Sequence, residues 1–143
     1  PVLFYDPVQR AIALAHAGWR GMVAGIVPAT IQAMARAFET RPSDLWAGVG
    51  PAIGMHHYPV GEEVIDAVQE VVPGKATVTA RYAGQWYLDL PGAVAAQLQE
   101  MGVGCIDASE VCTACHIDEW YSHRAERGRT GRFGVLVWLE PLP

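Results

Sequence analysis

Short apolar runs alternate along this chain with stretches in which apolar residues recur at helical spacing. Short apolar runs typical of β-strands cover residues 2–5, 11–15 and 45–49. Between the second and third run, apolar residues recur every three or four positions from about Met22 to Glu39, as in a helix that packs one face on a core. Such alternation predicts an α/β or α+β domain with a mixed sheet.

Glycine, proline and polar residues mark the limits of further elements. Pro28 lies inside the first helical pattern, where it should kink the helix or mark its true start. A second helix is predicted from Gly61 to about Val72, and Asp89 could cap the N-terminus of a third. The other predictions are burial of strand 11–15 on both faces, a hairpin of residues 77–81 and 85–88, a weak strand at 103–108, one helical turn at 118–121 and a final strand at 133–139.

The composition is typical of a globular protein. The chain has 143 residues, of which 51% are apolar and only 17% are charged. This length is sufficient to bury a core, and the composition argues against disorder. We therefore expect a single domain over residues 1–143. The small charged fraction indicates that part of the surface is covered in the native assembly.

Charge and cysteine usage exclude several classes of protein. The formal net charge of −5 argues against binding to DNA or RNA, which requires a basic face. No stretch approaches the roughly 20 apolar residues of a membrane span, and no signal peptide opens the chain. The three cysteines do not resemble the disulfide framework of a secreted protein. We expect a cytoplasmic protein that binds neither nucleic acid nor membrane.

The stretch HAGWRG follows the apolar run 11–15 and combines reactive side chains with glycines. His16 could be a core histidine with its hydrogen bonds satisfied, or a metal ligand or acid/base group at the end of a strand. Gly18 and Gly21 would allow backbone N–H groups to approach a ligand. Trp19 would supply a flat wall, and Arg20 would bind an anion or form a structural ion pair.

A second polar segment, GPAIGMHHYPVGEE, covers Gly50–Glu63. Its glycines and prolines indicate a rigid loop between a strand and a helix. His56 and His57 are adjacent and should point in different directions, so by themselves they make a poor chelating pair. The loop could line a pocket, or it could be a surface loop with incidental histidines.

The stretch CTACH, Cys112–His116, has the spelling of a c-type haem attachment site. We reject haem because nothing indicates export and no region for an axial ligand stands out. The C-x-x-C spacing could supply half of a zinc site, although no second C-x-x-C exists. Packed thiols near a turn are the alternative.

The stretch SHRAERGRTGR, Ser122–Arg132, places a hydroxyl, a histidine and four arginines around two glycines. It could be a solvated run of charge or a loop that binds an anion. Arginine suits phosphate and carboxylate because its planar fork can bind two oxygens at once. A small anion fits better than a polymer in a chain that is acidic overall.

HAGWRG, then GPAIG with VGEEV, then CTAC with WYSHR and GRTGR, occur in this order in one family. From residue 1 to about 139, the chain resembles the YfiH/DUF152 family of laccase domains, long labelled multicopper polyphenol oxidases. The resemblance implies an α+β fold, an αββα sandwich with mixed sheets. It also implies a zinc ion bound by two histidines and one cysteine. The implied reactions are phosphorolysis of adenosine, inosine, guanosine or methylthioadenosine, and deamination of adenosine.

The resemblance assigns His16 to one of the zinc-ligand histidines. The other two ligands precede the matching region, and none of Cys105, Cys112 and Cys115 matches the ligand cysteine. We therefore expect the C-terminal portion of such a domain, weakly active unless an N-terminal segment completes the site. Many relatives carry two cysteines at the loop position that His56 and His57 occupy here. The candidate catalytic residues are His16 and Arg20, and the candidate nucleoside- and phosphate-binding residues are Gly50, Pro51, His57, Ser122, Arg124 and Arg132.

Two other functions remain open at this point. A copper-dependent polyphenol oxidase would need several copper sites, and five histidines fit that requirement badly. A non-catalytic fragment or binding module could pair with another chain through the strand that opens the sequence.

Overall fold

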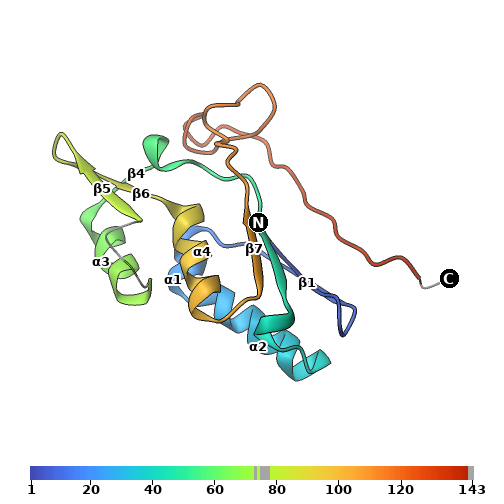
Figure 1. Ribbon diagram of the computed structural model, residues 1–143. Helices are drawn as coiled ribbons and strands as arrows, with labels where there is room; N and C mark the ends of the chain where they lie inside the picture. Colours follow the sequence, from blue (N-terminus) through green and yellow to red (C-terminus); the bar gives the residue numbers. More distant parts are fainter. Residues whose placement is uncertain (73, 75–77, 142–143) are drawn as a thin grey trace.

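The strands form two sheets in the computed structural model, which describes residues 1–72, 74 and 78–141 (Figure 1). The larger sheet has the order β2–β1–β3–β7, from β1 (Val2–Asp6), β2 (Ala11–Ala15), β3 (Trp46–Val49) and β7 (Cys105–Ala108). The smaller sheet has the order β4–β6–β5, from β4 (Pro59–Val60), β5 (Thr79–Tyr82) and β6 (Gln85–Leu88). Strand β1 is antiparallel to both neighbours, whereas β3 and β7 are parallel. The predicted α+β class with a mixed sheet is therefore confirmed.

The helices gather on one face of the larger sheet (Figure 1). They are α1 (Trp19–Val23), α2 (Ile26–Phe38), α3 (Glu62–Val71) and α4 (Leu90–Glu100), with 3-10 turns at Pro42–Asp44 and Met55–His57. Helix α2 packs on β2, and α4 packs on β3 and β7, while α3 contacts α1 and β6. Within the described ranges, no helix is both long enough and apolar enough to cross a membrane.

The core lies between the larger sheet and these helices. Val2 and Phe4 of β1 are buried, and their neighbours across the sheet, Val49 and Ala47, are buried on the same face. The helices contribute buried apolar side chains to the core. Those of α2 and α3 were predicted from their helical spacing: Val27, Ile31 and Met34, and Val64, Ile65 and Val68. Helix α4 adds Ala93, Val94 and Leu98.

The opposite face of the larger sheet carries partly exposed apolar side chains. Leu14 of β2 is 42% exposed, and Trp46 of β3 is 59% exposed, with its ring edge-on to that of Tyr5. The prediction that residues 11–15 are buried on both faces is therefore wrong: β2 is an edge strand, and the helices cover one side of it.

The single helix predicted from Met22 to Glu39 is two helices. Helix α1 ends at Val23, and Gly25 adopts a positive φ of 81° immediately before α2. A left-handed residue interrupts the helical path, and glycine takes this conformation with no steric cost. Pro28 lies in the first turn of α2, where its missing N–H has no helical acceptor in any case. It marks the start of a helix, one of the two outcomes predicted for it.

Turn and cap predictions are confirmed in the middle of the chain. Ala83 and Gly84 have φ values of 48° and 81°, the pair of positive angles that a tight hairpin turn requires, and they join β5 to β6. Residue 77, the first of the predicted hairpin, lies outside the described residues. The Asp89 carboxylate accepts a hydrogen bond of 3.0 Å from the N–H of Gly92 and so caps α4.

The segment after β7 departs most from prediction. The single helical turn predicted at 118–121 begins about two residues earlier, where the carbonyl of His116 accepts hydrogen bonds from the N–H groups of Glu119 and Trp120. The strand predicted at 133–139 is wrong, because this segment is extended but pairs with no strand in the described part of the chain. It runs away from the sheets (Figure 1), and Leu136 is 87% exposed. A continuous apolar run predicts a strand, but a strand also needs a free edge within reach.

Candidate functional site

A cavity of about 650 Å³ opens beside the end of β2. Three parts of the chain that lie far apart in sequence form its walls: the start of HAGWRG, the GPAIG loop, and the segment from 113 to 135. Its size is in the ordinary range for a small-molecule pocket. The lining residues are Pro1, Leu14, Ala15, His16, Ala17, Gly18, Pro51, Ala52, Leu90, Thr113, Tyr121, His123, Thr130, Gly131, Arg132, Phe133 and Val135.

His16 lies at the wall of this cavity because HAGWRG makes a tight passage from strand to helix. The carbonyl of Gly18 accepts the first helical hydrogen bond, 2.8 Å from the N–H of Met22. A Cβ at Gly18 would lie 3.3 Å from the Nε2 atom of His16, and a Cβ at Gly21 would lie 3.2 Å from the His16 carbonyl oxygen. Both glycines therefore make room for this histidine, which is itself exposed to the cavity.

The residues around His16 do not by themselves fit a zinc ion. In the described part of the chain, one group of three or more histidine, cysteine or acidic side chains could hold a metal ion, and His16 does not belong to it. A zinc site needs three or four protein ligands. His16 could supply one, but no group of three such side chains among the described residues includes it.

Arg132 and His123 also line the cavity, so two further nitrogen-bearing side chains share it with His16. The guanidinium of Arg132 is exposed, and its Nη1 donates a hydrogen bond of 3.1 Å to the carbonyl of Gly131. Tyr121 and Phe133 add aromatic surface. His123 was not among the predicted site residues, although its position in the SHR stretch was a signal that could have identified it.

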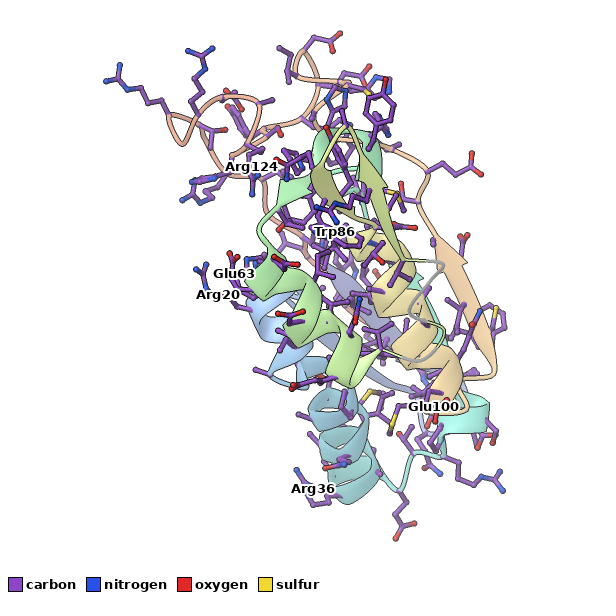
Figure 2. All side chains as sticks on the ribbon, turned by 90° about the vertical axis from the view of Figure 1, so that its left-hand side faces the viewer. Arg20, Arg36, Glu63, Trp86, Glu100 and Arg124 are labelled. Carbon is purple, nitrogen blue, oxygen red and sulfur yellow. The ribbon has the colours of Figure 1, made fainter. Side chains whose placement is uncertain are left out.

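Arg20 and Arg124 face a second hollow, of about 520 Å³, instead of the His16 cavity. In Figure 2, Arg20 lies next to Glu63 at the start of α3, with Arg124 above them. The polar groups of this hollow are thus two arginines, a glutamate and an amide. Its lining residues are Trp19, Arg20, Pro59, Val60, Gly61, Glu63, Val64, Gln85 and Arg124.

Aromatic rings hold both of these arginines. The guanidinium carbon of Arg20 lies 4.6 Å from the ring centre of Trp19, and that of Arg124 lies 5.0 Å from the ring centre of Tyr58. Arg124 also donates a hydrogen bond to the carbonyl of Pro59. Burial raises the pKa of the Tyr58 hydroxyl, and the two positive charges oppose this effect. Both arginines are therefore positioned on the wall of the second hollow.

Two of the predicted binding residues have structural contacts. Gly50 donates its N–H to the carbonyl of Pro1 at 2.9 Å, and a Cβ at Gly50 would lie 2.8 Å from the Pro1 ring. Ser122 is 3% exposed, and its N–H donates to the Glu126 carboxylate at 2.7 Å. Thr130 donates its hydroxyl to the same carboxylate, and these two bonds hold the pKa of Glu126 below its usual value. The arginine-rich loop is thus folded around Glu126.

His57 lies in neither cavity but in a third group of side chains, with His56 and Cys115. The ligand atoms of these three exposed residues are all within 4.8 Å of one another. His56 Nε2 is 3.1 Å from the Cys115 sulfur, and the two imidazole rings are 4.6 Å apart. We predicted a poor chelating pair because adjacent side chains should point in different directions. Sequence spacing could not show that CTAC folds against this loop and brings Cys115 to both histidines.

The two thiols of CTAC have opposite pKa shifts. Burial acts to raise the pKa of Cys112, but backbone N–H groups of Gly54, Cys115 and Ala114 point at its sulfur and bring the pKa below its usual value. The pKa of Cys115 is raised, by desolvation and then by its hydrogen bond to the Cys112 sulfur. Cys112 is therefore the thiol that carries negative charge more readily.

Residues 1–140 match the family model described as multi-copper polyphenol oxidoreductase laccase. The chain is 38% identical over 141 residues to purine nucleoside phosphorylase YlmD of Geobacillus stearothermophilus, which covers 96% of this chain and 52% of that protein. It is 41% identical over 140 residues to purine nucleoside phosphorylase ORF3 of Streptomyces griseus, covering 98% of this chain and 55% of that protein.

A solved structure gives the same result for the fold. The crystal structure of YlmD from Geobacillus stearothermophilus matches with a TM-score of 0.86 and 36% identity, over 92% of this chain and 50% of that chain. The chain thus spans about half the length of the curated relatives it matches. Because the family model covers nearly all of the sequence, in which the three motifs occur in order, the chain belongs to the multi-copper polyphenol oxidoreductase laccase family.

Proposed function

We propose that the protein takes part in the phosphorolysis of purine nucleosides, with His16 at the reacting centre. The observation that carries this proposal is the cavity of about 650 Å³ in which His16, His123 and Arg132 meet an apolar wall. A nucleoside has an apolar, flat base and a polar sugar, and such a cavity offers surfaces for both. The relatives named purine nucleoside phosphorylase support the same activity.

In phosphorolysis a phosphate oxygen bonds to C1′ of the ribose while the bond from C1′ to the purine nitrogen breaks. The products are ribose 1-phosphate and the free base, which takes up a proton. Arg132 is the residue we assign to the phosphate, since its fork can bind two phosphate oxygens and it lies in the same cavity as His16. Tyr121 and Phe133 are positioned to stack on the base.

Arg20 and Arg124, the other arginines predicted to bind phosphate, are less suited to this step. Both line the second hollow, and neither lines the cavity of His16. Within the proposal, they would act on the substrate only if the two hollows were joined by a change in the loop that carries Arg124. We therefore assign the phosphate to Arg132 first.

The substrates we propose are adenosine, inosine, guanosine and methylthioadenosine, with deamination of adenosine as a second activity. Zinc dependence belongs to the same proposal, with His16 as one ligand. Because no group of three metal-binding side chains among the described residues includes His16, a zinc ion there would need ligands from residues beyond those placed around it. The role of His16 is thus tied to the intact protein, and any activity of this chain alone should be weak.

The test is to follow the release of hypoxanthine from inosine and inorganic phosphate by liquid chromatography, in the intact protein with zinc supplied. Arg132→Gln should raise the KM for phosphate at least about tenfold, as expected when one charge-assisted contact of about 1.5–3 kcal/mol is lost. The matched control is Arg129→Gln, since Arg129 is exposed in the same loop and does not line the cavity. His16→Ala should abolish base release. Equal KM values in the two arginine variants would contradict the assignment, and absence of base release in the wild type would favour a non-catalytic role.

Copper-dependent oxidation of phenols is the second candidate, favoured by the family description and by the group of His56, His57 and Cys115. A multi-copper oxidase needs several copper ions, whereas the described residues provide one group of this kind. Metal analysis with a phenol oxidation assay separates the two functions. Stoichiometric copper with phenol turnover and no base release would replace the phosphorylase proposal.

A further inference from the structure

Two loops that are about 60 residues apart in sequence are joined next to the His16 cavity. The N–H of Thr113 donates to the carbonyl of Ala52 at 3.0 Å, and the N–H of Ala52 donates to the carbonyl of Val111 at 3.4 Å. These bonds form an isolated parallel bridge between Ala52 and Cys112. As a result, the 3-10 turn Met55–His57 lies against the CTAC stretch.

This contact brings together side chains that commonly bind zinc. His56 Nε2 is 3.1 Å from the sulfur of Cys115, and His57 completes a group whose ligand atoms all lie within 4.8 Å of one another. Zinc bonds of about 2.3 Å to sulfur and about 2.0–2.1 Å to nitrogen place tetrahedral ligand atoms about 3.3–3.8 Å apart. The observed spacings bracket these values, so small rotations of exposed side chains suffice.

Cys112 is not one of the three residues of this group, but it lies beside them and is the candidate for a fourth ligand. Two residues separate it from Cys115, so the two form a C-x-x-C pair, the spacing with which two thiolates bind one zinc ion. The two thiols are also hydrogen-bonded to each other. The N–H of Gly54 donates to the Cys112 sulfur at 3.1 Å, which suits a sulfur that carries negative charge. Two sulfurs and two imidazoles are a common donor set for a closed tetrahedral site.

Gly54 allows the two loops to approach so closely. A Cβ on this residue would lie 2.7 Å from the Cε1 atom of His56 and 3.3 Å from the Cβ of Cys112. Any side chain there would therefore push His56 away from the cysteines. The close approach of the GPAIG loop to the CTAC stretch thus depends on a glycine at position 54. The contact of His56 with the cysteines depends on the same approach.

We propose that His56, His57, Cys112 and Cys115 form a structural zinc site that fastens the GPAIG loop to the CTAC stretch, separate from the site of His16. The donor set of thiolate and imidazole, without a carboxylate, favours zinc over magnesium or calcium. With four protein ligands the ion has no open position for substrate. Its role is to hold the wall of the cavity, since Pro51, Ala52 and Thr113 line that cavity within a few residues of the four ligands.

The test is to titrate the reduced protein with Zn²⁺ alone and, in parallel, with Co²⁺ alone as a spectroscopic probe. Wild-type protein should give the thiolate-to-cobalt charge-transfer absorption of a tetrahedral site. Because His16 is not a ligand, His16→Ala should keep this band. In that background Cys115→Ser should weaken the band, since only the Cys112 thiolate would remain, and replacing both cysteines with serine should remove it. His57→Ala should weaken zinc binding by at least about 100-fold, since loss of an outer partner alone costs about 10–100-fold.

Matched controls are Cys105→Ser, an exposed thiol on β7, and His116→Ala, next to Cys115 in sequence but outside the metal-binding group. Both should bind zinc as the wild type does. Zinc should raise the melting temperature of wild type and of His16→Ala, but not of Cys115→Ser, whose metal-free melting temperature should match that of metal-free wild type.

Two results would overturn the proposal. The first is that, in the His16→Ala background, neither Cys115→Ser nor His57→Ala changes the affinity for zinc. The second is that His16→Ala by itself binds no zinc. Neither depends on nucleoside turnover, so failure of the zinc site and failure of the proposed function can be told apart.

Discussion

Replacing Asp6 with alanine should loosen the turn that delivers β2, and with it His16, to the cavity. Asp6 is fully buried at the end of β1. Its Oδ1 accepts hydrogen bonds from the N–H groups of Val8 and Gln9, at 2.8 and 3.0 Å. A hydrogen bond to a charged group contributes about 1.5–3 kcal/mol. In the variant, water can bind the N–H groups of the exposed turn and so replace part of this stabilisation. We expect Asp6→Ala to lower the free energy of unfolding by about 2–4 kcal/mol at pH 7.

The effect should depend on pH with a definite sign. Burial acts to raise the pKa of Asp6, but the hydrogen bonds, first among them that from Gln9, leave it below its ordinary value. A carboxyl group with a lowered pKa in the folded state stabilises the protein above its unfolded pKa of about 3.9. This contribution is lost as the pH falls towards the folded pKa, so wild type and Asp6→Ala should converge in stability below about pH 4.

Urea unfolding, followed by tryptophan fluorescence between pH 7 and pH 3, measures this difference. The control is Asp44→Ala, which removes an exposed ion pair of 2.8 Å with Arg41 and should cost less than about 1 kcal/mol. A difference between wild type and Asp6→Ala that stays constant over this pH range would refute the argument, because it would show that the ionised carboxylate does not supply the stability.

Three further predictions concern the core, the hairpin and the metal-binding loop. Phe4 is 1% exposed in the middle of the larger sheet, so Phe4→Ala should cost about 3–5 kcal/mol in urea unfolding, whereas Tyr82→Ala, at a side chain 76% exposed, should cost at most about 0.5 kcal/mol. Ala83 has a φ of 48°, so Ala83→Gly should raise the melting temperature by a few degrees, and a fall would contradict the turn geometry. Gly54→Ala places a Cβ 2.7 Å from His56, so zinc affinity measured by chelator competition should fall at least about tenfold; unchanged affinity would mean that His56 is not a ligand.

Local rules predicted those parts of the fold that depend on neighbouring residues. The hairpin turn at Ala83 and Gly84 and the cap at Asp89 involve a few consecutive residues, and both are confirmed. The strand predicted at 133–139 failed because a run of apolar residues says nothing about where a pairing edge lies. The long helix failed at Gly25, where one left-handed residue outweighs the apolar period on either side.

The candidate site likewise has features that the sequence predicted and features that it could not predict. HAGWRG indicated a histidine at the end of a strand with glycines beside it, and the structure places His16 there, at a cavity wall. The arginines that were candidates for binding an anion are separated, since Arg132 faces this cavity while Arg20 and Arg124 face another. Which way a loop side chain points depends on contacts with residues distant in sequence, and residue spacing does not contain that information.

By itself, the sequence determined the α+β class, the limits of most helices and strands, and the family, because each depends on local periodicity or on motifs read in order. Only the tertiary structure decided that His56 and His57 meet Cys115, since the bridge between Ala52 and Cys112 joins loops some 60 residues apart. A metal-binding group forms only where its side chains lie within a few ångströms of one another. Those distances are set by how the sheets and loops pack, after the local elements have formed.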